Sequence, residues 1–131
     1  MRYVITGIIA AAISFGATTA HAKSTSIIGS WSGSGVTKGK SGKQGSARCD
    51  MVYRKGSGKS YSMQATCTVS SIGEVSQTAS VKKVGANRYS GKFHNFQHNV
   101  KGTITVVLRG RSQSVTMTSP RGRATVRLAK H

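Results

Sequence analysis

Carboxylates are nearly absent from this chain, although most acid–base and metal chemistry in proteins requires them. Asp50 and Glu74 are the only acidic residues, against 20 lysines and arginines, and the formal net charge is +18 over 131 residues. A two-carboxylate mechanism needs both acids in one site, and the strand pattern below places Asp50 on an outward face. No Gly-x-Ser-x-Gly motif stands between a strand and a helix, where it would position a nucleophile. The sequence therefore predicts no catalytic residues and a non-enzymatic binding function.

His94 and His98 are four residues apart, the spacing at which two imidazoles share one face of a helix. Here they bracket a strand end and a loop, where the same spacing does not bring two rings together. No third ligand is evident apart from the terminal His131. We interpret both as surface-loop histidines and predict no metal and no cofactor.

Cys49 and Cys67 are the only two cysteines. Two cysteines at this distance, without further Cys or His ligands nearby, do not make a zinc site. A redox pair would have the Cys-x-x-Cys spacing. An even number of cysteines in an exported protein predicts a disulfide between Cys49 and Cys67.

The N-terminus has the pattern of a secretory signal peptide. A positive start at Arg2 precedes an apolar stretch, and Ala20-His21-Ala22 fits the small-x-small cleavage rule. The alternative, a membrane anchor, would need about 20 predominantly apolar residues. We therefore predict a signal peptide at 1–22 and a single basic β-domain at 23–131, in the periplasm or secreted. Without Arg2, 19 basic residues face two acids, a net charge of +17.

The mature region has the alternating pattern of an all-β protein, with short runs separated by Gly, Ser and Asn. Eight strands are predicted, at 27–36, 47–55, 60–70, 75–84, 88–93, 100–109, 112–118 and 123–130. Tight turns between consecutive strands predict an antiparallel up-and-down meander. Closure into a small barrel would remove its exposed edges; a β-sandwich is the alternative.

The predicted second hairpin supports the disulfide. If its turn centres on Gly58, the inward residues pair as Cys49 with Cys67, Met51 with Ala65, and Tyr53 with Met63. Opposed residues in a non-hydrogen-bonded antiparallel pair lie close enough for a disulfide.

Basic side chains have outward parity on the last three predicted strands and their turns. If these strands are neighbours, one wall and its rim carry Lys101, Arg109, Arg111, Arg121, Arg123 and Arg127. A passive soluble surface needs a net charge of only about 2–8. The excess favours a polyanion-binding role for these six residues.

Two resemblances are consistent with this interpretation. Gly29-Ser30-Trp31 is similar to the Gly-x-Trp opening of lipocalin-type barrels, in which the tryptophan closes one end of the barrel. A wider pattern resembles a group of small exported alphaproteobacterial proteins with no established activity. It comprises Trp-Ser-Gly-Ser-Gly at Trp31, two cysteines, Tyr89-Ser90-Gly91 and a terminal Arg127-Leu128. This resemblance implies an exported β-domain and brings no binding residues.

The composition thus predicts an exported protein that binds an anionic partner of the envelope or host. Lipopolysaccharide, acidic glycans, anionic lipid surfaces with peripheral contact, and acidic proteins fit the compartment better than nucleic acid. One alternative is a lipocalin-like carrier of a small apolar ligand, its interior lined by Trp31, Met51, Met63, Val106 and Met117. Another is an inhibitor of a secreted enzyme that uses its loops as wedges.

Overall fold

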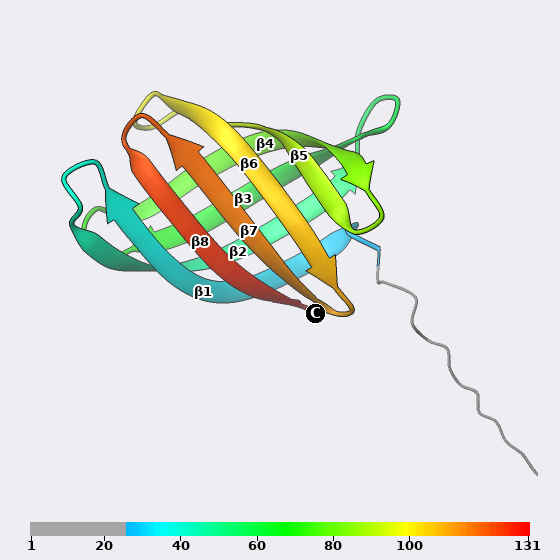
Figure 1. Ribbon diagram of the computed structural model, residues 1–131, viewed down its shortest axis with the longest axis horizontal. Helices are drawn as coiled ribbons and strands as arrows, with labels where there is room; N and C mark the ends of the chain where they lie inside the picture. The colour runs from blue at the N-terminus through cyan, green and yellow to red at the C-terminus, as the bar shows by residue number, and fades with distance from the viewer. Residues whose placement is uncertain (1–25) are drawn as a thin grey trace, which may run out of the picture.

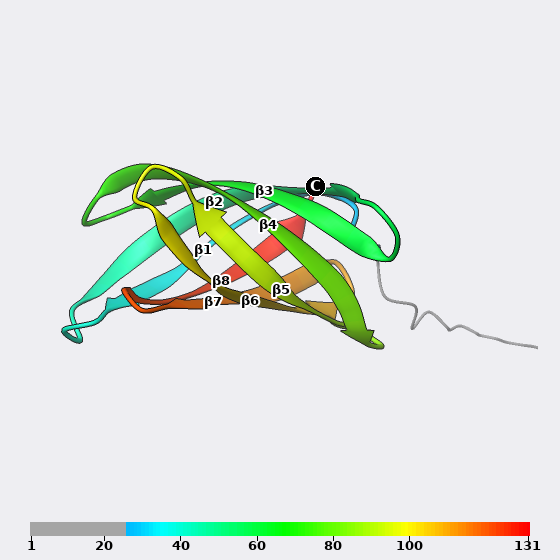
Figure 2. The same cartoon turned by 90° about the horizontal axis from the view of Figure 1, so that it is seen from above.

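The computed structural model describes residues 26–131, and the predicted signal peptide at 1–22 lies outside them. Eight antiparallel strands follow one another around a closed barrel, which β8 completes by pairing with β1 (Figures 1 and 2). The strands are β1 (Gly29–Gly39), β2 (Gln44–Lys55), β3 (Ser60–Val69), β4 (Gly73–Gly85), β5 (Arg88–Asn95), β6 (Val100–Arg109), β7 (Ser112–Ser119) and β8 (Gly122–Lys130). The predicted barrel is confirmed, and the chain does not form the sandwich. In the described part of the chain, no helix is long and apolar enough to cross a membrane.

Several strands extend past the predicted limits at one end of the barrel. The β1–β2 ladder continues to Lys38 and Gln44, beyond the last apolar side chain of either strand. Asn95, outside the predicted strand at 88–93, is the last residue of β5 and is buried. Apolar alternation reports burial, whereas backbone pairing continues into positions with polar side chains. The predicted strands are therefore too short at the end of the barrel where the ladders continue through polar residues.

The C-terminus lies at one end of the barrel (Figure 1). Large inward side chains, among them Trp31, Met51 and Tyr53, fill the half of the barrel at that end. Trp31 is 1% exposed and its indole Nε1 donates to the Ile27 carbonyl oxygen at 2.9 Å. The Lys130 ammonium lies 5.5 Å from the centre of the Trp31 ring. Trp31 thus closes this end, as the resemblance to lipocalin-type barrels implied. We call it the closed end.

The predicted disulfide between Cys49 and Cys67 is present. Cys49 lies directly opposite Cys67 in the β2–β3 ladder, with Met51 opposite Ala65 and Tyr53 opposite Met63. The predicted register is therefore confirmed. A disulfide also indicates that the folded chain occupies a non-reducing environment.

Removing this disulfide in the double variant Cys49→Ala/Cys67→Ala is expected to lower the free energy of unfolding by about 3 kcal/mol. The bond closes a loop across 18 residues of sequence, and a loop of that length gains about this much from the restricted unfolded chain. Urea unfolding measures the change, with the dithiothreitol-reduced wild type as a second comparison. A loss below about 1 kcal/mol in both would contradict the expectation.

A buried tyrosine–glutamine pair lies within the core. The Tyr53 hydroxyl donates to Gln113 Oε1 at 2.9 Å, and both side chains are 1–2% exposed. Burial raises the pKa of Tyr53 above its ordinary value, because the phenolate would lose its hydration. The hydrogen bond satisfies the phenol, which would otherwise be costly in an apolar interior.

The raised pKa of Tyr53 predicts a loss of stability in alkali. Above pH 10 the unfolded tyrosine ionises while the folded one stays protonated, so the unfolding free energy falls by up to about 1.4 kcal/mol per pH unit. Tyr53→Phe is expected to cost about 1 kcal/mol at pH 7, through the lost hydrogen bond, and to flatten this decline. Urea unfolding at pH 8 and pH 11 measures both effects. Equal declines in variant and wild type would contradict the assignment.

Candidate ligand-binding cavity

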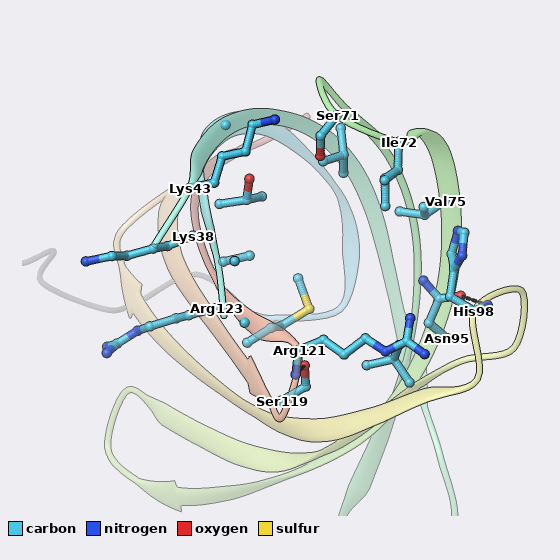
Figure 3. A pocket seen from close by; sticks show the side chains of 18 of the residues that line it. Lys38, Lys43, Ser71, Ile72, Val75, Asn95, His98, Ser119, Arg121 and Arg123 are labelled. Atoms are coloured by element: carbon cyan, nitrogen blue, oxygen red, sulfur yellow. Dashed lines mark hydrogen bonds between the residues drawn. The ribbon is translucent and has the colours of Figure 1, made fainter. Parts of the chain in front are cut away.

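The half of the barrel opposite the closed end is hollow. A cavity of about 430 Å³ opens there, between the β1–β2, β3–β4, β5–β6 and β7–β8 loops (Figure 3). We call this the open end. Inward positions on β1, β2 and β8 are occupied by small residues in this half, and they leave the space unfilled: Gly39, Gly45, Gly122 and Ala124.

The walls of the cavity are mainly apolar. The apolar side chains come from β3 through β8 and comprise Val69, Val75, Phe93, Val100, Met117 and Ala124. Two amides, Gln77 and Asn95, also face this space and are 9% and 6% exposed. The Gln77 amide donates to the Met117 sulfur at 3.4 Å, and Asn95 Oδ1 accepts from the His98 backbone N–H at 3.2 Å. An apolar pocket with a few convergent polar groups is the usual form of a small-molecule site.

Basic side chains stand at the mouth of the cavity, and they point in two directions (Figure 3). Arg121 extends across the mouth towards Asn95, and Lys43 extends towards Ser71. Lys38 and Arg123 point away from the cavity, so only their backbones border it.

The two basic loops are tied together through their backbones. The Lys40 backbone N–H donates to the Arg121 carbonyl oxygen at 3.2 Å, and the Gly39 N–H donates to the Lys43 carbonyl oxygen at 2.8 Å. These bonds fix the β1–β2 loop against the β7–β8 turn. Lys43 and Arg121 therefore come from neighbouring loops, and their side chains extend over different parts of one opening (Figure 3).

One side of the open end lacks a continuous ladder. In the described part of the chain, pairing between β4 and β5 starts at Thr78 and His94, which leaves the first five residues of β4 without a β5 partner. Gln97 spans this gap, because its Oε1 accepts from the Ser76 backbone N–H at 2.7 Å. A single side chain thus replaces backbone pairing beside the cavity.

The six predicted polyanion-binding residues are all exposed, but they do not form one compact group. β6, β7 and β8 are neighbours, so the predicted wall exists. Lys101, Arg121 and Arg123 lie near the open end, Arg109 and Arg111 lie at the closed end, and Arg127 lies between them. Lys101 and Arg109 are eight residues apart on β6, which is roughly 26 Å along a strand.

Basic residues of three turns gather at the closed end, although they are distant in sequence. The β2–β3, β4–β5 and β6–β7 turns all lie at this end and carry Arg54, Lys55, Lys59, Lys82, Lys83, Arg88, Arg109 and Arg111. Lys130 joins them but is restrained, because its ammonium donates to the Ser26 carbonyl oxygen at 2.7 Å. Burial lowers the pKa of Lys130, and the positive charge of Arg111 adds to this effect.

The interior residues predicted for a carrier are placed differently from expectation. Only Met117 lines the cavity, whereas Trp31, Met51, Met63 and Val106 are packed in the closed half. Alternation gives the inward face of a strand but not the level along the barrel. The cavity residues Gln77, Asn95, Lys43 and Arg121 were not predicted to act together.

One prediction about a side chain needs correction. His94, interpreted as a surface-loop residue, lies in β5 and is half-buried, and its Nε2 has no partner. The Phe96 ring lies against it, at 4.0 Å between ring centroids. Tyr89 is buried and packs edge-on against Tyr61. Within residues 26–131 no group of three or more His, Cys, Asp or Glu side chains could hold a metal ion.

Comparison with solved structures identifies the architecture. The redesigned β-barrel mFAP1, bound to DFHBI, superimposes with a TM-score of 0.65 at 12% identity, over 80% of this chain and 94% of that one. A de novo designed fluorescence-activating β-barrel gives 0.62 at 12%, over 80% and 94%. At these identities the likeness shows a shared β-barrel fold. A scan of family models and a search of curated proteins gave no match. The resemblance to exported alphaproteobacterial proteins therefore remains an interpretation of the sequence.

Proposed function

We propose that this protein is a non-enzymatic binder of single-chain anionic amphiphiles. The observation that carries the proposal is the apolar cavity whose mouth lies between Lys43 and Arg121 (Figure 3). Its volume of about 430 Å³ falls within the usual range of small-molecule sites, about 300–1,000 Å³. The apolar tail would occupy the barrel and the anionic group would meet the two cations.

The placement of the cations favours an anionic head group over a neutral one. A charge at the rim of an apolar cavity is less screened than one on an open surface, so Lys43 and Arg121 act more strongly on a bound anion than the outward residues do. The arrangement combines the two predictions made from sequence, recognition of an anion and a carrier with an apolar interior. A carboxylate, sulfate or phosphate group fits the donors of lysine and arginine.

The size of the cavity and the disulfide narrow the ligand class further. A cavity of about 430 Å³ holds one acyl chain and cannot enclose the several chains of a glycolipid such as lipopolysaccharide. The disulfide between Cys49 and Cys67 supports a periplasmic or secreted location, where fatty acids and lysophospholipids are available. We propose ligand binding without a chemical step, since the only carboxylates, Asp50 and Glu74, are exposed on outward faces.

Replacing both mouth cations in Lys43→Ala/Arg121→Ala is expected to weaken dodecanoate binding about tenfold, equivalent to about 1.4 kcal/mol. Dodecanol has the same chain and no charge, so it makes no charge-assisted contact that this variant could remove. Its affinity should therefore change less than about twofold. Displacement of the fluorescent anion anilinonaphthalene sulfonate measures both affinities.

The matched control is Arg109→Ala/Arg111→Ala, which removes the same net charge at the closed end. This variant should bind both ligands as the wild type does. If the two double variants lose the same affinity for dodecanoate, the net charge of the protein is responsible and the proposed head-group site is wrong. If the wild type binds neither ligand, the proposed function is wrong.

The basic turns at the closed end support a second candidate function, which is binding of an acidic glycan, acidic protein or nucleic acid. Binding that rests on many phosphate or sulfate contacts falls steeply with salt. Heparin binding of the wild type and of Arg109→Ala/Arg111→Ala across a salt series tests this candidate. If the second candidate function is correct, the wild type should still bind heparin at about 0.15 M salt, and Arg109→Ala/Arg111→Ala should bind heparin more weakly.

A further inference from the structure

Exposed apolar side chains lie at the open end on either side of the incomplete β4–β5 ladder. Phe96 follows β5 and is 68% exposed, and Ile72 precedes β4 and is 57% exposed. Large apolar side chains on loop tips lose contact with water only when another surface covers them. Both loops border the cavity, since Ile72 and His98 contribute to its lining.

The same end carries a positive charge. The basic residues are Lys38, Lys40, Lys43, Lys101, Arg121 and Arg123, and the one acid of the described residues at this end is Glu74. Six cations and one acid leave a charge of +5. An anionic leaflet attracts each lysine or arginine that comes close to it.

We propose that the open end docks on an anionic lipid bilayer, with Phe96 and Ile72 entering the interface. Charge complementarity selects an anionic surface, and the apolar loop tips select a bilayer over a soluble polyanion, which offers no apolar interior. The docked orientation would place the cavity mouth against the lipids. A single-chain amphiphile would then exchange between the bilayer and the barrel. This consequence of docking rests on the proposed function.

The apolar side chains, more than the charge, determine which end docks. The closed end is more basic than the open end, because it carries the eight basic turn residues and Lys130 against a charge of +5. Electrostatic attraction alone would therefore favour docking through the closed end. Its exposed apolar residues are Val84 at 59% and Ile28 at 42%, and neither is aromatic. An aromatic side chain buries more area at an interface than an aliphatic one, which favours the end that carries Phe96.

Cosedimentation with vesicles at 0.15 M salt tests the proposal. Wild type should bind vesicles of equal phosphatidylglycerol and phosphatidylcholine, and bind pure phosphatidylcholine vesicles at least about tenfold more weakly. Phe96→Ser should weaken binding to the mixed vesicles about tenfold, the factor expected from partial burial of one phenylalanine. Val84→Ser is the matched control, because Val84 is similarly exposed at the closed end, and it should change binding less than twofold.

Heparin separates bilayer docking from attraction to any polyanion. Phe96→Ser should bind heparin as the wild type does, because heparin has no apolar core. Equal losses of vesicle binding in Phe96→Ser and Val84→Ser, no loss in either, or a matching loss of heparin binding would overturn the docking proposal.

Anilinonaphthalene sulfonate binding without vesicles distinguishes this failure from failure of the proposed function. Phe96 does not line the cavity, so Phe96→Ser should bind the dye with wild-type affinity. Dye binding without docking would leave the cavity proposal standing and refute only the orientation. Docking without dye binding would refute the proposed function and leave the membrane surface in place.

Discussion

Replacing Ala124 by tryptophan is expected to weaken dodecanoate binding by at least about 100-fold, equivalent to about 2.8 kcal/mol. Ala124 is on β8 at the wall of the cavity, where its small side chain leaves the space open. An indole at this position would occupy the volume that the ligand tail requires. Because the cavity provides the room, the substitution should cost less than about 1 kcal/mol of stability, below the usual cost of overpacking.

Ala129→Trp is the control for this experiment. Ala129 lies on the same strand but points outward and is exposed, opposite Ser32 and Ser112. An indole there adds the same apolar group without entering the barrel, so dodecanoate affinity should stay within about twofold of wild type. Titration calorimetry measures affinity, and urea unfolding measures stability. Wild-type affinity in a stably folded Ala124→Trp variant would show that the ligand binds elsewhere.

The fold was largely predictable because its signals are local. Alternation gave the inward face of each strand, and glycine-containing turns gave the boundaries between consecutive strands. The parity shared by Cys49 and Cys67 then fixed the register of one hairpin, which the structure confirms. Few topologies remain once consecutive strands are predicted to pair antiparallel. Closure into a barrel is favoured among them because it removes the two exposed edges of the sheet.

The cavity was not predictable from the same signals. Trp31, Met51 and Met117 all have inward parity, yet only Met117 faces open space. The level of a residue along the barrel depends on strand tilt and stagger, which sequence alternation does not report. The available signal was the gathering of small residues at one end of β1, β2 and β8, and its meaning depended on knowing which strands lie side by side.

The sequence allowed a prediction of which face of the barrel carries the basic residues. It did not allow a prediction of the end of the barrel at which each of them lies. In an up-and-down barrel, alternate turns lie at opposite ends, so the β6–β7 turn with Arg111 cannot share a rim with the β7–β8 turn with Arg121. This parity of turns follows from topology alone and would have placed Lys43 beside Arg121. Sequence does not show the directions of those two side chains, or the backbone hydrogen bond from Lys40 to Arg121 that joins their loops.

Gly33→Ala is expected to be the most damaging single substitution considered for stability, with a loss above about 4 kcal/mol. Gly33 lies on β1 opposite Leu128 of β8, the pair of strands that closes the barrel. A Cβ at this position would lie 1.8 Å from the Arg127 carbonyl oxygen and 2.8 Å from the Leu128 Cα. These are backbone atoms, so relief requires β1 and β8 to separate rather than a side chain to rotate.

Gly39→Ala is the matched control on the same strand, because a Cβ there would meet only the Lys43 carbonyl oxygen, at 3.7 Å. This variant should stay within about 0.5 kcal/mol of wild type, as surface substitutions usually do. A small domain is stable by only about 5–15 kcal/mol, so Gly33→Ala should unfold at much lower urea concentration or fail to accumulate as folded protein. Equal stability of the two variants would mean that β1 and β8 do not approach closely at Gly33.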